Sequence, residues 1–186
     1  MRIVGGTFKG RRLQAPEGRE LRPTADRVRE AVFNILGHGL DVDIEGLAVV
    51  DFFAGTGAMG LEALSRGAAH ATFVDQSSEA NRLIRKNAGA LGAAQNTTVL
   101  NLGADNLPPP PLIANAPCAL AFLDPPYETG LATPALISAA AKGWIETGSI
   151  CTVELAAKET FDVPAGFDVL DERKYGAARV FFLEAV

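Results

Sequence analysis

The chain has 186 residues, of which 48% are hydrophobic and 21% are charged, and its formal net charge is −5. This length and apolar content exclude general disorder and suit one folded unit with at most a small appendage. Two cysteines are too few for a disulfide framework or a zinc site, so we expect no metal. No apolar run approaches the ~18 residues of a transmembrane helix and no secretory signal is visible, so we expect a cytoplasmic protein.

The charge is unevenly distributed along the chain. Residues 1–30 hold eight basic and four acidic residues, a net charge of +4, whereas residues 31–186 hold nine basic and eighteen acidic residues, a net charge of −9. A basic segment in front of an acidic body is expected for a protein that touches a polyanion at one end. A solvated surface that is merely arginine-rich would have the same composition, so charge alone leaves both interpretations open.

The basic segment is predicted to form a small appendage. A short hairpin is expected over residues 2–14, where Gly-Gly and Gly10 supply the turns. An irregular, proline-containing arm follows it. An apolar period then predicts a helix that begins at Thr24 and ends at Gly37 and Gly39.

From residue 47 onward the pattern changes to alternating strands and helices. Apolar runs predict strands at 47–50, 71–74, 97–100, 119–123 and 149–155, and helices are expected near 58–66, 77–91 and 131–142. A proline-rich loop covers 103–117, and two further strands at 166–171 and 178–184 are expected to pair as a hairpin. This order predicts an α/β fold with a mostly parallel, doubly wound sheet and an antiparallel C-terminal hairpin. We divide the chain into residues 1–40 and 41–186.

A glycine-rich loop follows the first of these strands. Residues 49–60 read V-V-D-F-F-A-G-T-G-A-M-G, in which Gly55, Gly57 and Gly60 form the pattern G-x-G-x-x-G. Asp75 ends the next strand, 15 residues beyond Gly60. Taken in isolation, this spacing is also typical of a dinucleotide-binding loop.

Asp51 favours a different ligand. A carboxylate four residues before Gly55 would repel a pyrophosphate at the helix N-terminus but would suit a cation. S-adenosyl-L-methionine carries an ammonium and a sulfonium group and no phosphate. Asp75 is then placed to accept hydrogen bonds from ribose hydroxyls, and Asp105, which we place at the end of the third strand, lies near the adenine. The alternative is that Asp51 and Asp75 only cap helices.

A second motif, L-A-F-L-D-P-P-Y at 120–127, ends the fourth strand. Pro125 and Pro126 remove two N–H donors, so Asp124 and the backbone carbonyls form an acceptor-rich corner. Two acceptors can hold both hydrogens of an exocyclic base amine and aim its lone pair at a methyl group. Tyr127 offers a ring on which the base could stack. The alternative is a structural turn capped by Asp124.

These motifs resemble class I methyltransferases that act on amino groups, and the N-terminal segment narrows the resemblance. R-I-V-G-G-T-F-K-G-R-R-L at 2–13 and R-P-T-A-D-R-V-R-E-A-V-F-N-I-L at 22–36 are similar to the signatures of the RsmD family. Those enzymes are bacterial 16S ribosomal RNA guanine-N2 methyltransferases. The resemblance covers nearly the whole chain, and the proline-rich 103–117 loop is its clearest departure.

The resemblance implies a Rossmann-like fold, S-adenosyl-L-methionine as cofactor, and methyl transfer to the N2 amine of a guanine in 16S rRNA, within a 30S subunit or an assembly intermediate. The expected cofactor contacts are Asp51, Phe53, Gly55, Gly57, Gly60, Asp75 and Asp105. The expected amine site is Asp124, Pro125, Pro126 and Tyr127. We expect a monomer with no membrane contact.

The basic N-terminal residues are the candidates for RNA contact, because arginine forks bind phosphate in a bidentate manner. The expected contacts are Lys9, Arg11, Arg12, Arg22 and Arg27. Arg27 and Arg29 are two residues apart and cannot share one helix face, so one of them is expected to be structural, paired for instance with Asp26 or Glu30.

Three other functions remain open. An adenine-N6 methyltransferase acting on DNA would also use D-P-P-Y, but such an enzyme is expected to carry an additional domain for reading duplex sequence. A nicotinamide-dependent oxidoreductase could use the glycine loop, although Asp51 weighs against it. A non-catalytic RNA-binding protein would require that no methyl donor binds.

Overall fold

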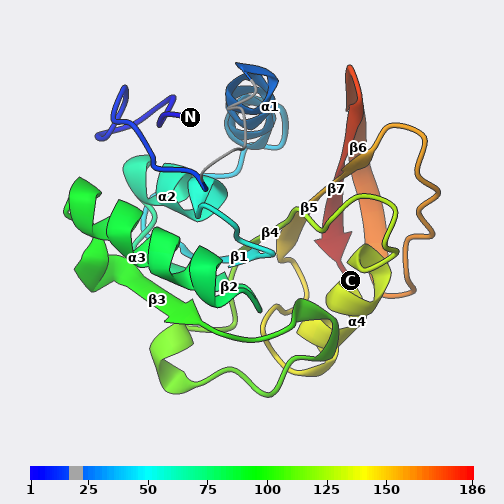
Figure 1. Cartoon of the computed structure of the whole chain (residues 1–186). Coiled ribbons are helices and arrows are strands. Elements are labelled where there is room, and N and C mark those ends of the chain that lie inside the picture. The colour runs from blue at the N-terminus through cyan, green and yellow to red at the C-terminus, as the bar shows by residue number, and fades with distance from the viewer. Residues whose placement is uncertain (17–22) are drawn as a thin grey trace.

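The computed structural model describes residues 1–16 and 23–186 (Figure 1). The elements in chain order are α1 Pro23–Asn34, β1 Ala48–Phe52, α2 Ala58–Ser65, β2 His70–Val74, α3 Ser78–Leu91, β3 Thr97–Leu100, β4 Leu120–Leu123, α4 Ala132–Ala141, β5 Ile150–Ala156, β6 Phe167–Tyr175 and β7 Ala178–Ala185. Among these helices, none is both long and apolar enough to cross a membrane.

The strands form one sheet in the order β3-β2-β1-β4-β5-β7-β6. The first five strands in this order are parallel, and β7 runs antiparallel between β5 and β6. The chain moves outward from β1 to β3 and then returns to β4 on the other side of β1. The sheet therefore has its topological switch point between β1 and β4, which is where open α/β sheets bind ligands.

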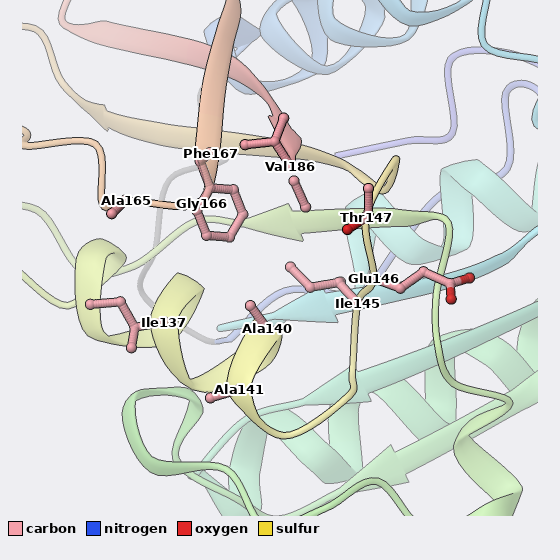
Figure 2. A pocket seen from close by; sticks show the side chains of 11 residues that line it. Ile137, Ala140, Ala141, Ile145, Glu146, Thr147, Ala165, Gly166, Phe167 and Val186 are labelled. Atoms are coloured by element: carbon pink, nitrogen blue, oxygen red, sulfur yellow. The ribbon is translucent and has the colours of Figure 1, made fainter.

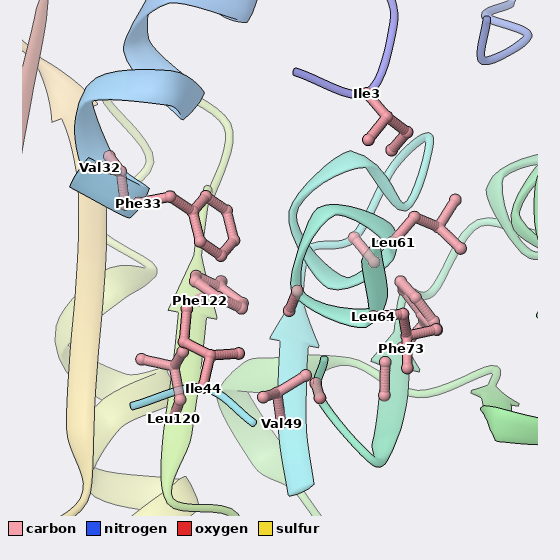
Figure 3. Close-up of a cluster of buried hydrophobic side chains, with 14 of the residues drawn as sticks. Ile3, Val32, Phe33, Ile44, Val49, Leu61, Leu64, Phe73, Leu120 and Phe122 are labelled. Atoms are coloured by element: carbon pink, nitrogen blue, oxygen red, sulfur yellow. The ribbon is translucent and has the colours of Figure 1, made fainter. Parts of the chain in front are cut away.

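Alternate side chains of the strands enter two separate cores. Val49 and Phe73 pack with α1, α2 and α3 on one face, whereas Val50 and Val74 pack with α4 on the other. Figure 3 shows the first core, in which Phe33 of α1 meets Phe122 of β4 with ring centroids 5.5 Å apart. The predicted doubly wound arrangement is confirmed.

The N-terminal segment is part of the first core. Ile3 and Leu13 are buried in the same core as Val32 of α1 and Leu61 of α2. Figure 3 shows Ile3 on the side of α2 that carries Leu61. The predicted hairpin is much shorter than expected, because its pairing is reduced to a single antiparallel bridge between Arg2 and Arg12. Both parts of the chain on either side of residue 40 thus contribute to one core.

Most other expected elements lie within a few residues of their predicted bounds. Ser77 caps α3, because its hydroxyl accepts the Ala80 amide at 3.3 Å. β6 continues to Tyr175, beyond the predicted end at 171, because it pairs with β7 over its whole length. The proline-rich loop packs against the second core, where the fully buried Trp144 donates its indole N–H to the Pro108 carbonyl at 2.7 Å.

Candidate active site

A cavity of about 1050 Å³ opens at the carboxyl ends of the parallel strands, at the switch point between β1 and β4. Nine of the predicted site residues line it: Asp51, Phe53, Gly55, Asp75, Asp105, Asp124, Pro125, Pro126 and Tyr127. A second hollow of about 490 Å³ lies between α4 and the C-terminal residues (Figure 2). Alkyl and aromatic groups such as Ile137 and Phe167 make up most of its wall, so the chemistry concentrates in the larger cavity.

The glycine loop turns from β1 into α2 through left-handed backbone conformations. Phe53, Gly55 and Gly57 have φ angles of 57°, 54° and 77°. Gly55 faces the cavity, whereas Gly57 and Gly60 do not line it. A Cβ on Gly60 would lie 2.4 Å from the Phe73 ring, so this glycine lets α2 approach the sheet closely. The motif therefore combines a cavity position with two positions that serve packing.

Asp51 is buried at the end of β1 with 2% exposure, and it also lines the cavity. Its Oδ2 atom accepts the Gly60 amide at 2.9 Å, so the capping role does exist. Burial, opposed by this hydrogen bond and helped by the nearby charge of Asp75, raises the pKa of Asp51 to about 8. A cation in the cavity would favour the ionised form of Asp51.

Asp75 connects two of the loops that surround the cavity. Its Oδ2 atom accepts the Gly55 amide at 2.9 Å, and its Oδ1 atom accepts the Ser77 amide at 2.8 Å. A carboxylate has about four acceptor sites, so the remaining lone pairs can still accept hydroxyl donors. The capping and ligand-binding interpretations of Asp75 are thus compatible.

Asp105 does not lie at the end of a strand, as predicted, but in the loop beyond it. β3 stops at Leu100, and Asp105 is exposed in a short 3₁₀ turn over Ala104–Asn106. It nevertheless reaches the cavity, together with Gln76, a residue that the sequence did not suggest. β3 has its predicted bounds, so the difference arises because several loop residues separate Asp105 from the end of the strand.

The D-P-P-Y corner follows β4 directly. Asp124 is accessible from the cavity, and the Pro126 carbonyl accepts the Thr129 hydroxyl at 2.6 Å. The Tyr127 hydroxyl donates to Oε1 of Glu154 at 3.0 Å. Glu154 lies on β5 and lines the same cavity, although the sequence analysis did not select it. The signal was available, since Glu154 is the acidic residue within the apolar run of β5.

Three carboxyl groups share this part of the cavity, and their proximity affects their ionisation. The pKa of Asp124 is raised well above its usual value, because the cavity walls reduce its solvation and because the charges of Glu154 and Asp51 add repulsion. Burial likewise raises the pKa of Glu154, and the Tyr127 hydroxyl opposes that effect. The protonation of these carboxyl groups is therefore coupled.

The N-terminal segment and α1 form another wall of the cavity, and they are held by a buried ion-pair cluster. Arg29 is 3% exposed, and its guanidinium pairs with Asp26 at 2.8 Å and with Glu62 at 3.4 Å. Glu62 also accepts the Val4 amide at 2.8 Å and the Gly5 amide at 2.7 Å. Arg29 is therefore the structural arginine of the expected pair, and its predicted partner Asp26 is confirmed.

The other basic candidates lie on the surface. Lys9, Arg11, Arg12 and Arg27 are exposed, and the Arg11 guanidinium donates to the Ala90 carbonyl near the end of α3. Arg22 falls outside the described residues. The exposed side chains come from the same N-terminal segment and α1 that supply a wall of the cavity.

The chain is similar to known proteins over nearly its whole length. The family model described as conserved hypothetical protein 95 matches residues 1–184. Ribosomal RNA small subunit methyltransferase D of Escherichia coli is 36% identical over 190 residues, which cover 100% of this chain and 91% of that protein. The protein of the same name from Haemophilus influenzae is 32% identical over 179 residues, with 95% and 89% covered. The solved structure of yhhF from Escherichia coli has a TM-score of 0.79 at 34% identity, covering 100% of this chain and 97% of that one.

Proposed function

The chain belongs to the conserved hypothetical protein 95 family, the RsmD family of methyltransferases, and from this premise we propose that it methylates the N2 amine of a guanine in 16S ribosomal RNA. The observation that carries the proposal is the meeting of four features in one cavity. These are Asp51 at the end of β1, Asp75 after β2, the D-P-P-Y corner after β4, and the N-terminal segment at the wall.

S-adenosyl-L-methionine fits the donor set of the cavity. Asp51 places a carboxylate where a dinucleotide would need its pyrophosphate. Asp51 and Asp75 leave acceptors for an ammonium group and for ribose hydroxyls. Asp105 and Gln76 extend the polar wall toward the position expected for the adenine. When bound, this cofactor supplies the methyl group, and the C–S bond breaks with its electron pair on sulfur as the amine lone pair forms the N–C bond.

The amine would be held by Asp124 and a proline-corner carbonyl. Because the Pro126 carbonyl already accepts the Thr129 hydroxyl, the Pro125 carbonyl is the better second acceptor. Two acceptors orient both N–H groups and stabilise the positive charge that develops on nitrogen. After transfer, one of these protons leaves the nitrogen for a carboxylate oxygen of the site. Tyr127, which is 42% exposed, offers its ring to the target base.

RNA contact is assigned to residues 1–40, and methyl transfer to residues 41–186. Lys9, Arg11, Arg12 and Arg27 are exposed on the N-terminal segment and α1, and their side chains suit phosphate oxygens. We propose that the enzyme acts as a monomer on the ribosomal RNA of a 30S particle or its precursor.

Mass mapping of ribosomal RNA from cells with and without the gene tests the function. We expect one N2-methylguanine in 16S rRNA that is absent from the deletion strain. Purified protein should then transfer labelled methyl groups to 16S rRNA or 30S particles from that strain. An unchanged 16S rRNA, or activity on duplex DNA alone, would refute the ribosomal assignment, and tighter binding of NAD than of S-adenosylhomocysteine would refute the methyltransferase assignment.

A further inference from the structure

Glu154 lies beside Asp124 at the carboxyl edge of the sheet. In the parallel pairing of β4 with β5, Leu123 is in register with Val153. The next residues along the two strands are Asp124 and Glu154, and both line the cavity. The backbone therefore places a second carboxyl group next to the one expected to hold the amine.

The same carboxyl group also restrains the aromatic ring of the motif. The phenol of Tyr127 donates to Oε1 of Glu154 at 3.0 Å. Tyr127 belongs to a loop, whereas Glu154 belongs to a strand that is paired on both sides by β4 and β7. A hydrogen bond from a loop residue to a rigid strand limits the positions that the ring can adopt, which prepares it for stacking on a base.

The charged groups around Glu154 are mostly acidic. Asp124 of the β4 corner and Asp51 of β1 lie in the same cavity, while Arg29 of α1 in the cavity wall is engaged by Asp26 and Glu62. On the neighbouring strand β7, the Arg179 guanidinium is directed to Glu172 and to the Glu159 carbonyl. Two adjacent carboxyl groups in such surroundings titrate as a pair.

We propose that Glu154 is a positioning residue of the methyl-transfer site, which fixes the Tyr127 ring for the target base and shares a proton with Asp124. This inference rests on the proposed function, because it assumes an amine at Asp124. Sharing one proton leaves one negative charge on the pair, so Asp124 keeps acceptor oxygens for the N–H groups. A second carboxylate beside Asp124 also adjusts the pH at which those oxygens become available.

Two substitutions separate the two roles of Glu154. Glu154→Gln keeps an amide oxygen that can accept the phenol of Tyr127 but removes the charge beside Asp124. Tyr127→Phe keeps the charge but removes the hydrogen bond. Glu128→Gln is the matched control, since it removes an exposed carboxylate next to Tyr127 that does not line the cavity.

The experiment measures kcat and KM for the RNA from pH 5 to pH 9, with calorimetry of S-adenosylhomocysteine binding as the check on folding. Because Glu154 raises the pKa of Asp124, Glu154→Gln should move the acidic limb of the kcat profile to lower pH, with the KM changed less than twofold. Tyr127→Phe should raise the KM for RNA by about three- to tenfold, the loss expected for one hydrogen bond, without moving that limb to lower pH. The control should match the unsubstituted enzyme.

Two results would overturn the inference. One is an acidic limb that stays in place in Glu154→Gln while cofactor binding is normal. The other is a KM in Tyr127→Phe equal to that of the control. Failure of the proposed function would look different, because the unsubstituted enzyme itself would then leave guanine N2 unmethylated.

Discussion

The carboxylate of Asp51 accepts the backbone amide of Gly60 at 2.9 Å, which ties the end of β1 to the first turn of α2. The same carboxyl group faces the cavity, and its pKa of about 8 lies far above the ordinary value of 3.8. The folded protein therefore binds a proton that the unfolded chain has released between these two pH values. Its stability must fall as the pH rises through this window.

Asp51→Asn tests that relationship. The amide oxygen can still accept from Gly60, and the variant has no charge to bury. We expect it to be more stable than the unsubstituted protein at pH 9, by on the order of a few kcal/mol, and by much less at pH 5. Urea unfolding at the two pH values measures the difference. An equal stability difference at both pH values would contradict the raised pKa of Asp51. The Asp51→Asn variant should also bind S-adenosylmethionine more weakly.

Gly60→Ala tests the close approach of α2 to the sheet. The new Cβ would fall 2.4 Å from the Phe73 ring, so the variant should lose about 1–3 kcal/mol of unfolding free energy. Gly89→Ala is the matched control, because a Cβ there meets nothing within 4 Å in α3. This control should gain about 0.5–1 kcal/mol from helix propensity. Equal effects at the two glycines would exclude a packing role for Gly60.

Asp124→Ala should separate methyl transfer from cofactor binding. The alanine side chain cannot accept a hydrogen bond from the target amine, so methylation of 16S rRNA should become undetectable. The proposed cofactor contacts at Asp51 and Asp75 remain, so the affinity for S-adenosylhomocysteine in calorimetry should stay within a few-fold. A parallel loss of cofactor affinity would show that Asp124 serves both ligands.

Arg11→Ala combined with Arg12→Ala tests the phosphate contact of the N-terminal segment. RNA affinity should fall. The slope of log K against log salt should decrease in magnitude by roughly 1–2 units, because fewer phosphate contacts mean that fewer counterions are released on binding. Lys142→Ala combined with Lys158→Ala removes two cations elsewhere on the chain and should leave the slope unchanged. If the slope also stays the same in the arginine variant, the segment does not contact phosphate.

Glu62→Ala should be strongly destabilising. It leaves the buried Arg29 guanidinium and the Val4 and Gly5 amides without their common acceptor, and the loss is expected to be about 3–5 kcal/mol. Urea unfolding of Glu146→Ala, at an exposed turn, provides the comparison and should change little. A comparably small change for Glu62→Ala would mean that the buried cluster contributes little to stability.

The sequence predicted the fold well because the strands and helices alternate with local signals of their own. Apolar runs such as 47–50 and 97–100, and the cap at Ser77, depend only on neighbouring residues. The hairpin over 2–14 was overestimated, since its residues bond instead to Glu62 and Ser65 of α2, far away in the sequence. The strand order and the pairing of the buried Arg29 with Glu62 likewise depend on contacts between distant segments.

The site was predicted in its motifs but not in its connections. Asp51, Asp75 and Asp124 could be selected because each follows an apolar strand. Glu154 stands out as an acid within an apolar strand, but its link to Asp124 and Tyr127 could not be predicted, because they become neighbours only when β5 pairs with β4. Asp105 was placed at a strand end although the predicted strand already stopped at residue 100, because the sequence does not show the path of the loop that follows β3.

The anchoring of the N-terminal segment limits how this protein can evolve. Glu62 accepts hydrogen bonds from the amides of Val4 and Gly5 and from the guanidiniums of Arg29 and Arg66. An N-terminal extension that was merely tethered could be exchanged between enzymes by recombination. This one shares a buried acid with the rest of the fold, so the two parts must change together, and substitutions at these positions should be correlated among its relatives.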